Sequence, residues 1–560
     1  MFQLLEGAVP YREEDAERYV REGWWRGLTL GDLLDRAAAI QPNKEAFIDS
    51  KNRLTYRQAK EQADRLAVAL TKIGIKPLDR VLLQLPNWSE FAPAYFGLQK
   101  IGAIPVMLID RYRQYEIGQL AALTGARAWF VPVQHRKVDF APIVNDVRKS
   151  HPSIEYVITV RGEIKEPGFY SLERLIAETD PTAGELAQLT EVKPHPDQIA
   201  HMGPTGGTTG APKVVPRTHN SLECAVEYCS YSWGQHCDDV NLIVGSIGHD
   251  LSFTKGFLGS VITMGSIVML DNTEAQAICE TIEREKVTAV IWVPTLAQRL
   301  VQYEEREKFD LSTLKKMHSA GGAAHPGLVE AVFDCLGVRF FNGYGATEGM
   351  TTITRPTDEV RTVCTTVGRP TCPGDIYKVV DSQGRTLPPG AQGELLVKGP
   401  SVFSGYYNNP QENARVFDAD GFFHTGDVAK IDEEGYITLT GRIKEMINRG
   451  GESISATVIE DLISRHPQVA AVAVIPMPDP VMGERVCAYI QPKAGAQLTF
   501  ETVITFLKEE QKASVLELPE RIEFVESMPY TAAFKLDKNA LRRDIEQKLA
   551  AEAAQKAETS

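Results

Sequence analysis

The sequence lacks the charge and the leader segment that would place it in several common classes. Lysine and arginine number 60 against 74 aspartates and glutamates, which gives a formal net charge of −14. Because nucleic-acid binding is built on basic surface, we expect no nucleic-acid partner. The first residues, MFQLLEGAVPYREEDAERYVREGWW, are acidic and show no basic stretch followed by an apolar core, so no secretory signal is predicted.

Long apolar runs and paired cysteines are also missing. The most apolar window, Gly256 to Leu270, is too short and too interrupted by glycine for a membrane span. The 8 cysteines include no CxxC pair, so neither a disulfide framework nor zinc-finger spacing is predicted. Cys229, His236 and Cys237 lie close in sequence but have no second ligand pair, which argues against zinc there. We therefore expect a cytoplasmic protein with reduced thiols.

What is present is a chain of 560 residues with 43% hydrophobic and 24% charged residues, values typical of globular proteins. Its length predicts two or more domains. Between residues 28 and 345, segments with helical spacing alternate with short apolar runs, which predicts layered α/β units with largely parallel sheets. Expected helices include Leu30–Ile40, Tyr56–Ile73 and Ala275–Glu285, and expected strands include 80–86 and 287–293.

From about residue 360 the sequence becomes rich in glycine and proline, and segments with the alternating pattern of β-strands follow one another. This pattern predicts a small antiparallel β subdomain. After Arg442 a shorter unit of helices and strands follows. The predicted fold class is therefore α/β, with a large N-terminal domain over residues 1–443 that includes the β subdomain. A small α+β C-terminal domain is expected over residues 444–560.

Residues 204–213, PTGGTTGAPK, combine three glycines, three threonines and one lysine. Glycine lets backbone N–H groups turn toward an anion, while hydroxyls and an ammonium add donors, so the stretch suits a polyphosphate. It is not a Walker A loop, because Lys213 follows Pro212 and no Gly-Lys-Ser/Thr run opens a helix. A P-loop kinase is therefore disfavoured. A plain surface turn is the simpler alternative, but it leaves the hydroxyls and the lysine unexplained.

Four later stretches carry further polar clusters: 342–349 (NGYGATEG), 423–427 (FHTGD), 441–445 (GRIKE) and 529–535 (PYTAAFK). A tyrosine such as Tyr344 can stack on a base, and a carboxylate such as Glu348 can hold Mg²⁺. Asp427 can bind a ribose diol through two acceptor oxygens. Each cluster alone also has an ordinary explanation, such as an Asx turn at Asp427 or a solvated lysine at Lys535.

In this order the motifs resemble those of the ANL superfamily of adenylate-forming enzymes, which includes acyl-CoA synthetases, nonribosomal peptide adenylation domains and luciferases. The resemblance covers nearly the whole chain. It implies two steps: a carboxylate attacks the α-phosphate of Mg·ATP to give an acyl-adenylate and pyrophosphate, and a thiol then displaces AMP. Between the steps the C-terminal domain is expected to rotate about a hinge at Lys444, moving Lys535 away.

The resemblance also assigns site residues, with ATP/AMP, Mg²⁺ and coenzyme A as the implied cofactors. The catalytic residues are Lys535, Thr347, Glu348 and His249, and Glu348 is also the metal ligand. The cofactor-binding residues are Thr205, Gly206, Gly207, Thr208, Thr209, Gly210, Lys213, Gly321, Gly322, Ala323, Asn342, Gly343, Tyr344, Gly345, Asp427, Arg442, Lys444, Gly450 and Gly451. The substrate pocket is His249, Asp250, Leu251, Thr254, Gly322 and Gly345.

The chain looks most similar to the branch of aryl-acid adenylating enzymes, the 2,3-dihydroxybenzoate–AMP ligases, but its pocket departs from theirs. Where catechol-acid enzymes carry His-Asn-Tyr, this chain has His249, Asp250 and Leu251. Losing groups that bind a hydroxyl relaxes the demand for one. We therefore expect a less hydroxylated ring acid, such as benzoate or cyclohexanecarboxylate. The alternative is a 2,3-dihydroxybenzoate–AMP ligase that loads a carrier protein in siderophore synthesis.

The expected acceptor is coenzyme A, since no carrier domain is fused to the chain. The overall chemistry is reversible, so a host could also run it toward ATP. Two departures from the family lie near the C-terminus: Phe534 stands where glycine usually precedes the lysine, and Leu516–Pro519 replaces a Tyr/Phe-Lys pair. The alternative from a different functional class is a protein that binds ATP or an acyl group but catalyses no reaction. A homodimer is expected, because it is common among similar enzymes.

Overall fold

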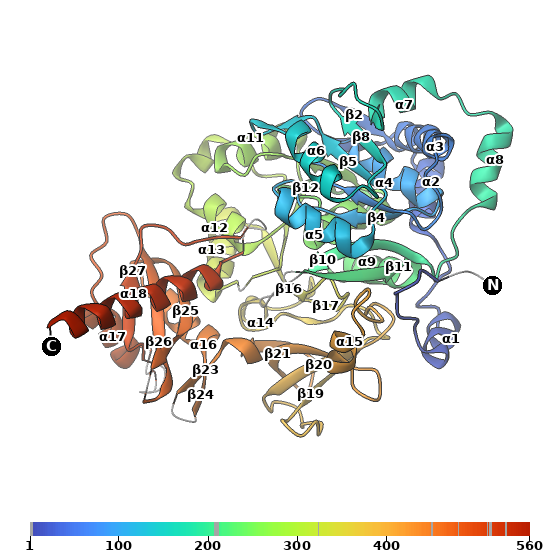
Figure 1. Cartoon of the computed structure of the whole chain (residues 1–560). Helices are drawn as coiled ribbons and strands as arrows, with labels where there is room; N and C mark the ends of the chain where they lie inside the picture. Colours follow the sequence, from blue (N-terminus) through green and yellow to red (C-terminus); the bar gives the residue numbers. More distant parts are fainter. Residues whose placement is uncertain are drawn as a thin grey trace.

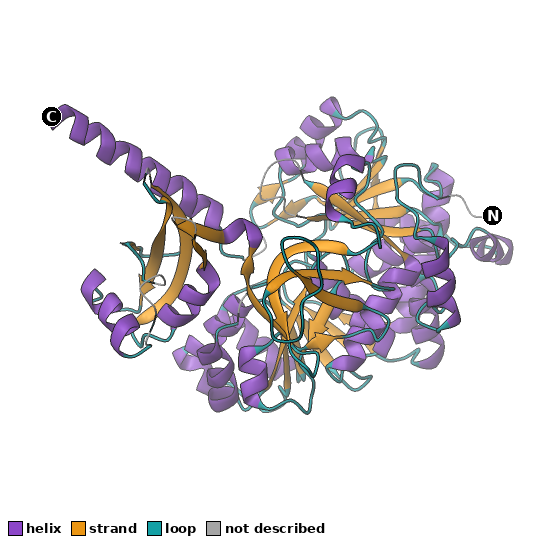
Figure 2. Ribbon diagram, turned by 90° about the horizontal axis from the view of Figure 1, so that it is seen from below, coloured by secondary structure: helices purple, strands orange, loops and turns teal. Residues whose placement is uncertain are grey.

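The computed structural model describes residues 4–205, 212–322, 324–449, 452–479, 481–511, 513, 518–531 and 535–559. Two large sheets and the helices between and around them form most of the molecule (Figure 1). A smaller body at the C-terminus stands apart from them and is joined by an extended connection (Figure 2). The chain is therefore mixed α/β with a large N-terminal and a small C-terminal domain, as predicted.

The first large sheet has seven strands, parallel apart from the antiparallel pairing of its last two in sequence. In spatial order they are β11 (Lys213–Thr218), β10 (Ile199–Thr205), β4 (Ile104–Met107), β3 (Arg80–Leu83), β5 (Ala128–Pro132), β8 (Tyr156–Val160) and β9 (Phe169–Ser171). Apolar residues fill both faces of its central strands, as expected for a parallel sheet covered on both sides.

The second large sheet has nine strands, with a parallel centre and antiparallel edges. In spatial order they are β18 (Arg369–Pro370), β17 (Thr351–Ile353), β16 (Arg339–Gly345), β15 (Lys316–Ser319), β14 (Ala289–Trp292), β12 (Val240–Ile243), β13 (Ser266–Met269), β1 (Glu45–Ile48) and β2 (Arg53–Thr55). The loops that follow β15 and β16 carry the glycine-rich motifs.

Helices α2 (Leu30–Ile40), α3 (Tyr56–Ile73) and α4 (Phe91–Lys100) share one core with strands of both large sheets. Threonine capping boxes at Thr29 and Thr55 begin the first two, because each hydroxyl satisfies a free backbone N–H of the first turn. The outer faces are covered by α5 (Gln114–Thr124) and α6 (Ala141–Ser150) on one sheet and by α11 (Ala275–Glu285), α12 (Pro294–Gln302) and α13 (Pro326–Leu336) on the other.

Most of the remaining helices of the N-terminal domain are short, but the longest of them, His219–Ser232, is largely buried. They are α1 (Glu13–Arg21), α7 (Leu172–Glu178), α8 (Ala183–Glu191), α9 (His219–Ser232), α10 (Gly259–Thr263), α14 (Val360–Thr365) and α15 (Pro410–Val416). No helix within the described ranges is both long and apolar enough to cross a bilayer. All eight cysteines are free thiols.

The predicted antiparallel β subdomain is a sheet of β19 (Ile376–Val380), β20 (Gly393–Lys398), β21 (Phe423–Ile431) and β22 (Ile437–Arg442). A short 3₁₀ turn, Ile443–Glu445, leads from it to the C-terminal sheet. That sheet contains β23 (Met446–Arg449), β24 (Glu452–Ser455), β25 (Val469–Asp479), β26 (Gly483–Pro492) and β27 (Arg521–Phe524). The predicted domain boundary at Lys444 falls within this turn and stays a prediction.

Helices α16 (Ala456–Ser464), α17 (Phe500–Glu509) and α18 (Lys538–Thr559) complete the C-terminal domain. Helix α18 begins at Lys538 and continues to Thr559. Its first turns are fixed by packing, since Leu541 and Ile545 are buried against β25 and β26. The full length of this helix was not predicted from the sequence, because its later turns have no regular spacing of apolar residues.

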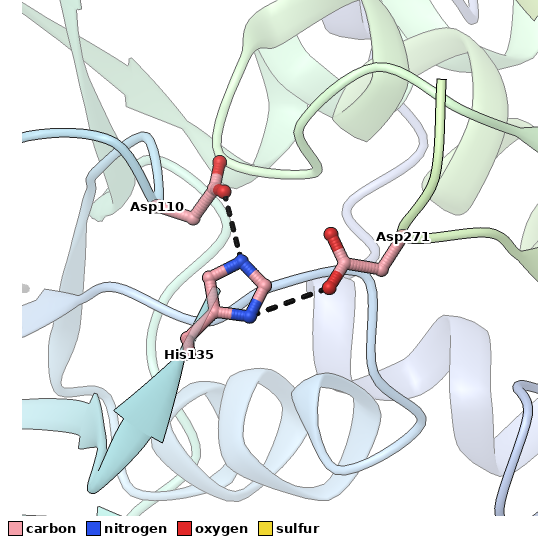
Figure 3. Close-up of side chains that lie close together, drawn as sticks. All are labelled: Asp110, His135 and Asp271. Atoms are coloured by element: carbon pink, nitrogen blue, oxygen red, sulfur yellow. Dashed lines mark hydrogen bonds and ion pairs between the residues drawn. The ribbon is translucent and has the colours of Figure 1, made fainter. Parts of the chain in front are cut away.

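A small hairpin, β6 (Gln134–His135) and β7 (Val138–Asp139), brings His135 between two carboxylates (Figure 3). Its Nε2 lies 3.3 Å from Asp110 Oδ2, and its Nδ1 lies 3.3 Å from Asp271 Oδ2. Arg136 donates to Asp271 at 2.7 Å. Because each ring nitrogen faces a different carboxylate, and an arginine joins them, the geometry is that of an ion-pair network linking the loops after β4 and β13.

Candidate active site

A cavity of about 3180 Å³ opens where the ends of the central strands, the β subdomain and the C-terminal domain meet. Loops at the carboxyl ends of parallel strands are the usual ligand sites of α/β sheets. Most of the predicted residues that the structure describes line this cavity. The described ones among them are Thr205, Lys213, His249, Asp250, Leu251, Gly321, Gly322, Asn342, Gly343, Tyr344, Gly345, Thr347, Glu348, Asp427, Arg442 and Lys535.

Tyr344, Asp427 and Arg442 come from three elements and meet through one carboxylate. The Tyr344 hydroxyl, at the end of β16, donates to Asp427 Oδ2 at 2.5 Å, and Arg442 Nε, at the end of β22, donates to Oδ1 at 2.7 Å. The Asp427 backbone N–H is itself held by Thr425 Oγ1 at 3.0 Å. Asp427 is only 3% exposed, so its charge depends on these partners. The stretches 423–427 and 441–445 thus contribute to one polar cluster.

Glu348 lies in the turn after β16, and one of its oxygens is fixed. Oε1 accepts a hydrogen bond of 2.7 Å from the hydroxyl of Tyr406, a largely buried residue in the cavity lining. Burial and the neighbouring Glu348 charge raise the pKa of Tyr406, so its hydroxyl stays a donor. Among the described residues nothing hydrogen-bonds the other Glu348 oxygen. The site therefore fits a divalent cation, which prefers a carboxylate oxygen as ligand.

Lys213, at the start of β11, contacts both a carboxylate and an aromatic ring. Its ammonium pairs with Glu412 of α15 and lies 4.8 Å from the centre of the Tyr406 ring. Glu412 is also bound by Arg415 at 2.6 and 2.8 Å. Hydrogen bonds from Arg415 and Lys213 outweigh burial and lower the pKa of Glu412 to about 2. Glu412 thus occupies the place of an anion beside the lysine of the glycine-rich stretch.

Lys535 reaches the cavity from the C-terminal domain. A side-chain carbon built on Gly321 would lie 3.4 Å from Lys535 Cε and 3.9 Å from its Nζ, so the lysine packs over the glycine loop after β15. The side chain is exposed to the cavity, yet crowding by protein lowers its pKa, and Arg442 lowers it further. Asp250 and Glu348 act in the opposite direction. The charges of two predicted site residues, the Asp250 and Glu348 carboxylates, therefore both act on the Lys535 ammonium.

Four of the predicted acyl-pocket residues, His249, Asp250, Leu251 and Thr254, lie on or just before a π-helical segment, Leu251–Leu258. Such wide turns often mark functional sites. Burial lowers the pKa of His249 to about 3, so its imidazole is neutral. The pKa of Asp250 is raised, again by burial. Thr254, by contrast, donates its hydroxyl to the Asp250 carbonyl at 2.7 Å and does not line the cavity.

Glycines set how closely the cavity walls approach each other. A side-chain carbon on Gly345 would come 2.8 Å from Met350 O, and one on Gly343 would come 2.9 Å from His318 Nε2. Gly349, with φ +105°, would meet Ser401 O at 2.1 Å. These positions keep glycine because a side chain would collide with backbone or ring atoms.

Two predicted residues have structural partners that limit what they can offer a ligand. The Asn342 amide nitrogen donates to Val363 O at 3.3 Å and to Thr366 O at 3.0 Å, which leaves only its oxygen. The Thr347 carbonyl accepts from Arg217 at 3.3 Å. Several predicted residues lie outside the described ranges, as do the side chain of Lys444 and the departure at Phe534. They are Gly206, Gly207, Thr208, Thr209, Gly210, Ala323, Gly450 and Gly451.

Sequence reasoning missed side chains that support the motifs from other elements. Tyr406 and Glu412 follow the β20 strand and carry no motif of their own. Arg217, 2% exposed, donates to the backbone oxygens of Thr347 and Ser401 and so fixes the turn that holds Glu348. The sequence signals were a tyrosine pair before an Asn-Pro turn and, four residues after the predicted phosphate loop, Arg217 in the stretch 216–219 (PRTH), which resembles the aryl-acid branch.

Comparisons with known proteins agree over nearly all of the chain. A family profile described as AMP-binding enzyme matches residues 34–407, and a second, AMP-binding enzyme C-terminal domain, matches residues 458–535. The 2,3-dihydroxybenzoate-AMP ligase of Bacillus subtilis (strain 168) is 36% identical over 98% of this chain and 99% of its own. The 2-hydroxy-7-methoxy-5-methyl-1-naphthoate–CoA ligase of Streptomyces carzinostaticus is 34% identical over 96% of both chains. The apo structure of Mycobacterium smegmatis MbtA superposes with a TM-score of 0.72 at 33% identity, over 97% of this chain and 100% of that one.

Proposed function

The chain belongs to the AMP-binding enzymes of the ANL superfamily, and from this premise we propose that it activates an aryl carboxylic acid with ATP. The products of the first step are an acyl-adenylate and pyrophosphate. The acyl group then passes to the thiol of a phosphopantetheine arm, and AMP leaves. The observation that carries the proposal is the convergence of Lys535, from the C-terminal domain, on the cavity that holds Glu348 and the Asp427–Arg442 pair.

The first step must bring two anions together, so the site has to neutralise charge where it develops. Lys535 is placed to bridge the attacking carboxylate and the α-phosphate. Lys213 would take a phosphate oxygen in exchange for Glu412. Glu348 would hold Mg²⁺, whose charge screens the triphosphate. Asp427 would accept the ribose hydroxyls while Arg442 keeps it in place.

The acid would lie against the π-helical segment, and the lining there favours a ring with a polar substituent. Lys255 is only 8% exposed and lines the cavity. Its ammonium donates to Thr351 Oγ1 at 2.9 Å, and within the described residues no carboxylate lies within ion-pair distance. A buried cation gains most from a further acceptor. A hydroxyl between Lys255 and Asp250 would both accept and donate a hydrogen bond. An unsubstituted benzoate-type acid, favoured by the sequence alone, stays the second candidate.

We propose a phosphopantetheine thiol as the acceptor, because coenzyme A and a carrier protein both present this group. The similar enzymes include a ligase named for an AMP product and a ligase named for a CoA product. Adenylation is measured first, as pyrophosphate exchange with benzoate, salicylate, 2,3-dihydroxybenzoate and cyclohexanecarboxylate. Thioester formation is then compared with coenzyme A and with a phosphopantetheinylated carrier protein. Absence of exchange with every aryl acid, in the presence of bound ATP, would contradict the proposal.

Replacing Lys255 with methionine tests the polar end of the pocket. We expect kcat/KM for a hydroxylated acid to fall about tenfold relative to benzoate, because one hydrogen bond to a charged group is lost. Methionine keeps most of the length of the side chain. The benzoate rate of the same variant is the internal control, since a folding defect would lower both rates. An unchanged ratio would contradict the assignment of Lys255.

The pH dependence of adenylation tests the protonated form of Lys535. Because crowding and Arg442 lower the pKa of Lys535, its charge is lost as pH rises at a lower pH than for an exposed lysine. We expect the exchange rate to fall on the alkaline side accordingly. In Lys535→Arg, whose guanidinium does not titrate there, any residual rate should lack this limb. The same alkaline limb in both proteins would assign it to another group.

A further inference from the structure

One buried tyrosine, Tyr406, contacts both groups that the proposed function places on the triphosphate. Its hydroxyl donates to Glu348 Oε1 at 2.7 Å, and its ring carries the Lys213 ammonium 4.8 Å from the centroid. The two contacts use different parts of the side chain, the hydroxyl edge and the ring face. Tyr406 itself is only 3% exposed, so a ligand would meet it through Glu348 and Lys213.

Neighbouring residues hold both the ring and the backbone of Tyr406. Its ring packs edge-on against Phe403, with centroids 4.9 Å apart and an interplanar angle of 64°. Its backbone N–H donates to Asn413 Oδ1 at 2.7 Å, and Asn413 Nδ2 returns a bond of 2.9 Å to its carbonyl. A buried side chain whose ring packs on Phe403 and whose backbone is held by Asn413 has little freedom to turn. The hydroxyl direction and the position of the ring face are therefore set together.

We propose that Tyr406 is a positioning residue that aligns the Glu348 carboxylate for Mg²⁺ and the Lys213 ammonium for the phosphates. The hydroxyl satisfies one Glu348 oxygen and leaves the other for the cation. Without that donor a carboxylate that is 7% exposed would keep an uncompensated oxygen and lose its orientation. The ring face holds Lys213 beside Glu412 without a competing hydrogen bond, so the ammonium can move to a phosphate oxygen while staying over the ring.

The inference rests on the proposed function, and the test separates the two roles of the side chain. ATP binding is measured by calorimetry with and without Mg²⁺ for Tyr406→Phe and Tyr406→Leu. Phenylalanine keeps the ring and removes the hydroxyl. We expect Mg²⁺-free binding to stay within twofold of wild type and the gain in affinity from Mg²⁺ to fall about tenfold. Leucine removes the ring as well, so we also expect Mg²⁺-free binding to weaken about threefold.

Tyr407→Phe is the matched control. It removes a hydroxyl from the next residue, which packs in a different apolar cluster with Leu5, Met202 and Val214. We expect it to bind ATP and Mg²⁺·ATP as wild type does. A wild-type gain from Mg²⁺ in Tyr406→Phe would overturn the inference, even if leucine is too disruptive to fold. A wild-type protein that binds Mg²⁺·ATP but adenylates no acid would instead contradict the proposed function, and the same titrations would still judge Tyr406.

Discussion

Replacing Lys535 with alanine is expected to lower pyrophosphate exchange by about 10²–10³-fold, the scale seen when one donor to a developing charge is removed. ATP binding should change by less than about threefold. The reason is geometric, because Lys535 comes from the C-terminal domain, whereas the proposed nucleotide contacts through Glu348, Asp427 and Lys213 belong to the N-terminal domain. Exchange measured at saturating ATP and acid, with calorimetry of ATP binding, checks both parts.

Two comparisons make this result specific. Lys508→Ala removes an exposed lysine from α17 of the same domain and should leave exchange unchanged. The second comparison supplies chemically prepared acyl-adenylate together with the thiol acceptor. Because the proposed role of Lys535 ends with adenylate formation, thioester synthesis from that adenylate should stay within a few-fold of wild type. Exchange within tenfold of wild type in Lys535→Ala would show that another cation bridges the reacting groups.

The elements that define the fold were predictable because their signals are local. Helices Leu30–Ile40 and Tyr56–Ile73 were predicted with the bounds that the structure has, since each combines a threonine cap with regular apolar spacing. The strand predicted at 287–293 is four residues, β14 (Ala289–Trp292), because the flanking positions turn into loops. Such end effects depend on neighbouring strands, which a single sequence does not display.

The residues of the site were predictable only where they belong to a recognisable sequence motif. Tyr344, Asp427 and Arg442 stand in separate motifs, and the structure brings them to one carboxylate. The supporting residues Tyr406 and Arg217 act through contacts that cross more than 50 and more than 100 sequence positions respectively. No spacing rule reaches that far, because these contacts depend on how the two large sheets and the β subdomain pack against one another.

The acyl pocket shows the same limit in another form. By the resemblance to catechol-acid enzymes, Asp250 and Leu251 stand in place of groups that bind a catechol, and this predicted a less hydroxylated ring acid. The π-helical turn, however, brings Lys255 to the same cavity. With regular α-helical spacing, a residue five positions after Asp250 would not share its face as closely. This local backbone irregularity is therefore the reason why we propose a ring acid with a polar substituent.

Replacing Asp427 with alanine is the second change with a large expected effect. Tyr344 and Arg442 both donate to this carboxylate, and the proposed ribose contact uses the same oxygens. The variant leaves a buried tyrosine hydroxyl without its acceptor and an arginine without its counter-ion, in addition to the lost ribose contact. At about 1.5–3 kcal/mol for a hydrogen bond to a charged group, we expect KM for ATP to rise about 100-fold.

The comparison of Asp427→Ala with Asp427→Asn separates ribose binding from support of the cluster. Asparagine keeps one oxygen acceptor and the volume but removes the charge that pairs with Arg442. If Asp427 mainly holds the hinge arginine, both variants should lose ATP affinity and adenylation alike. If it mainly accepts ribose hydroxyls, asparagine should retain part of the affinity, and 2′-deoxy-ATP should bind the alanine variant as weakly as ATP does. Asp420→Ala, an exposed aspartate in the turn before β21, is the control and should bind ATP normally. ATP affinity within threefold of wild type in Asp427→Ala would place the ribose elsewhere, because a buried carboxylate with two donors cannot be removed without effect if the nucleotide lies against it.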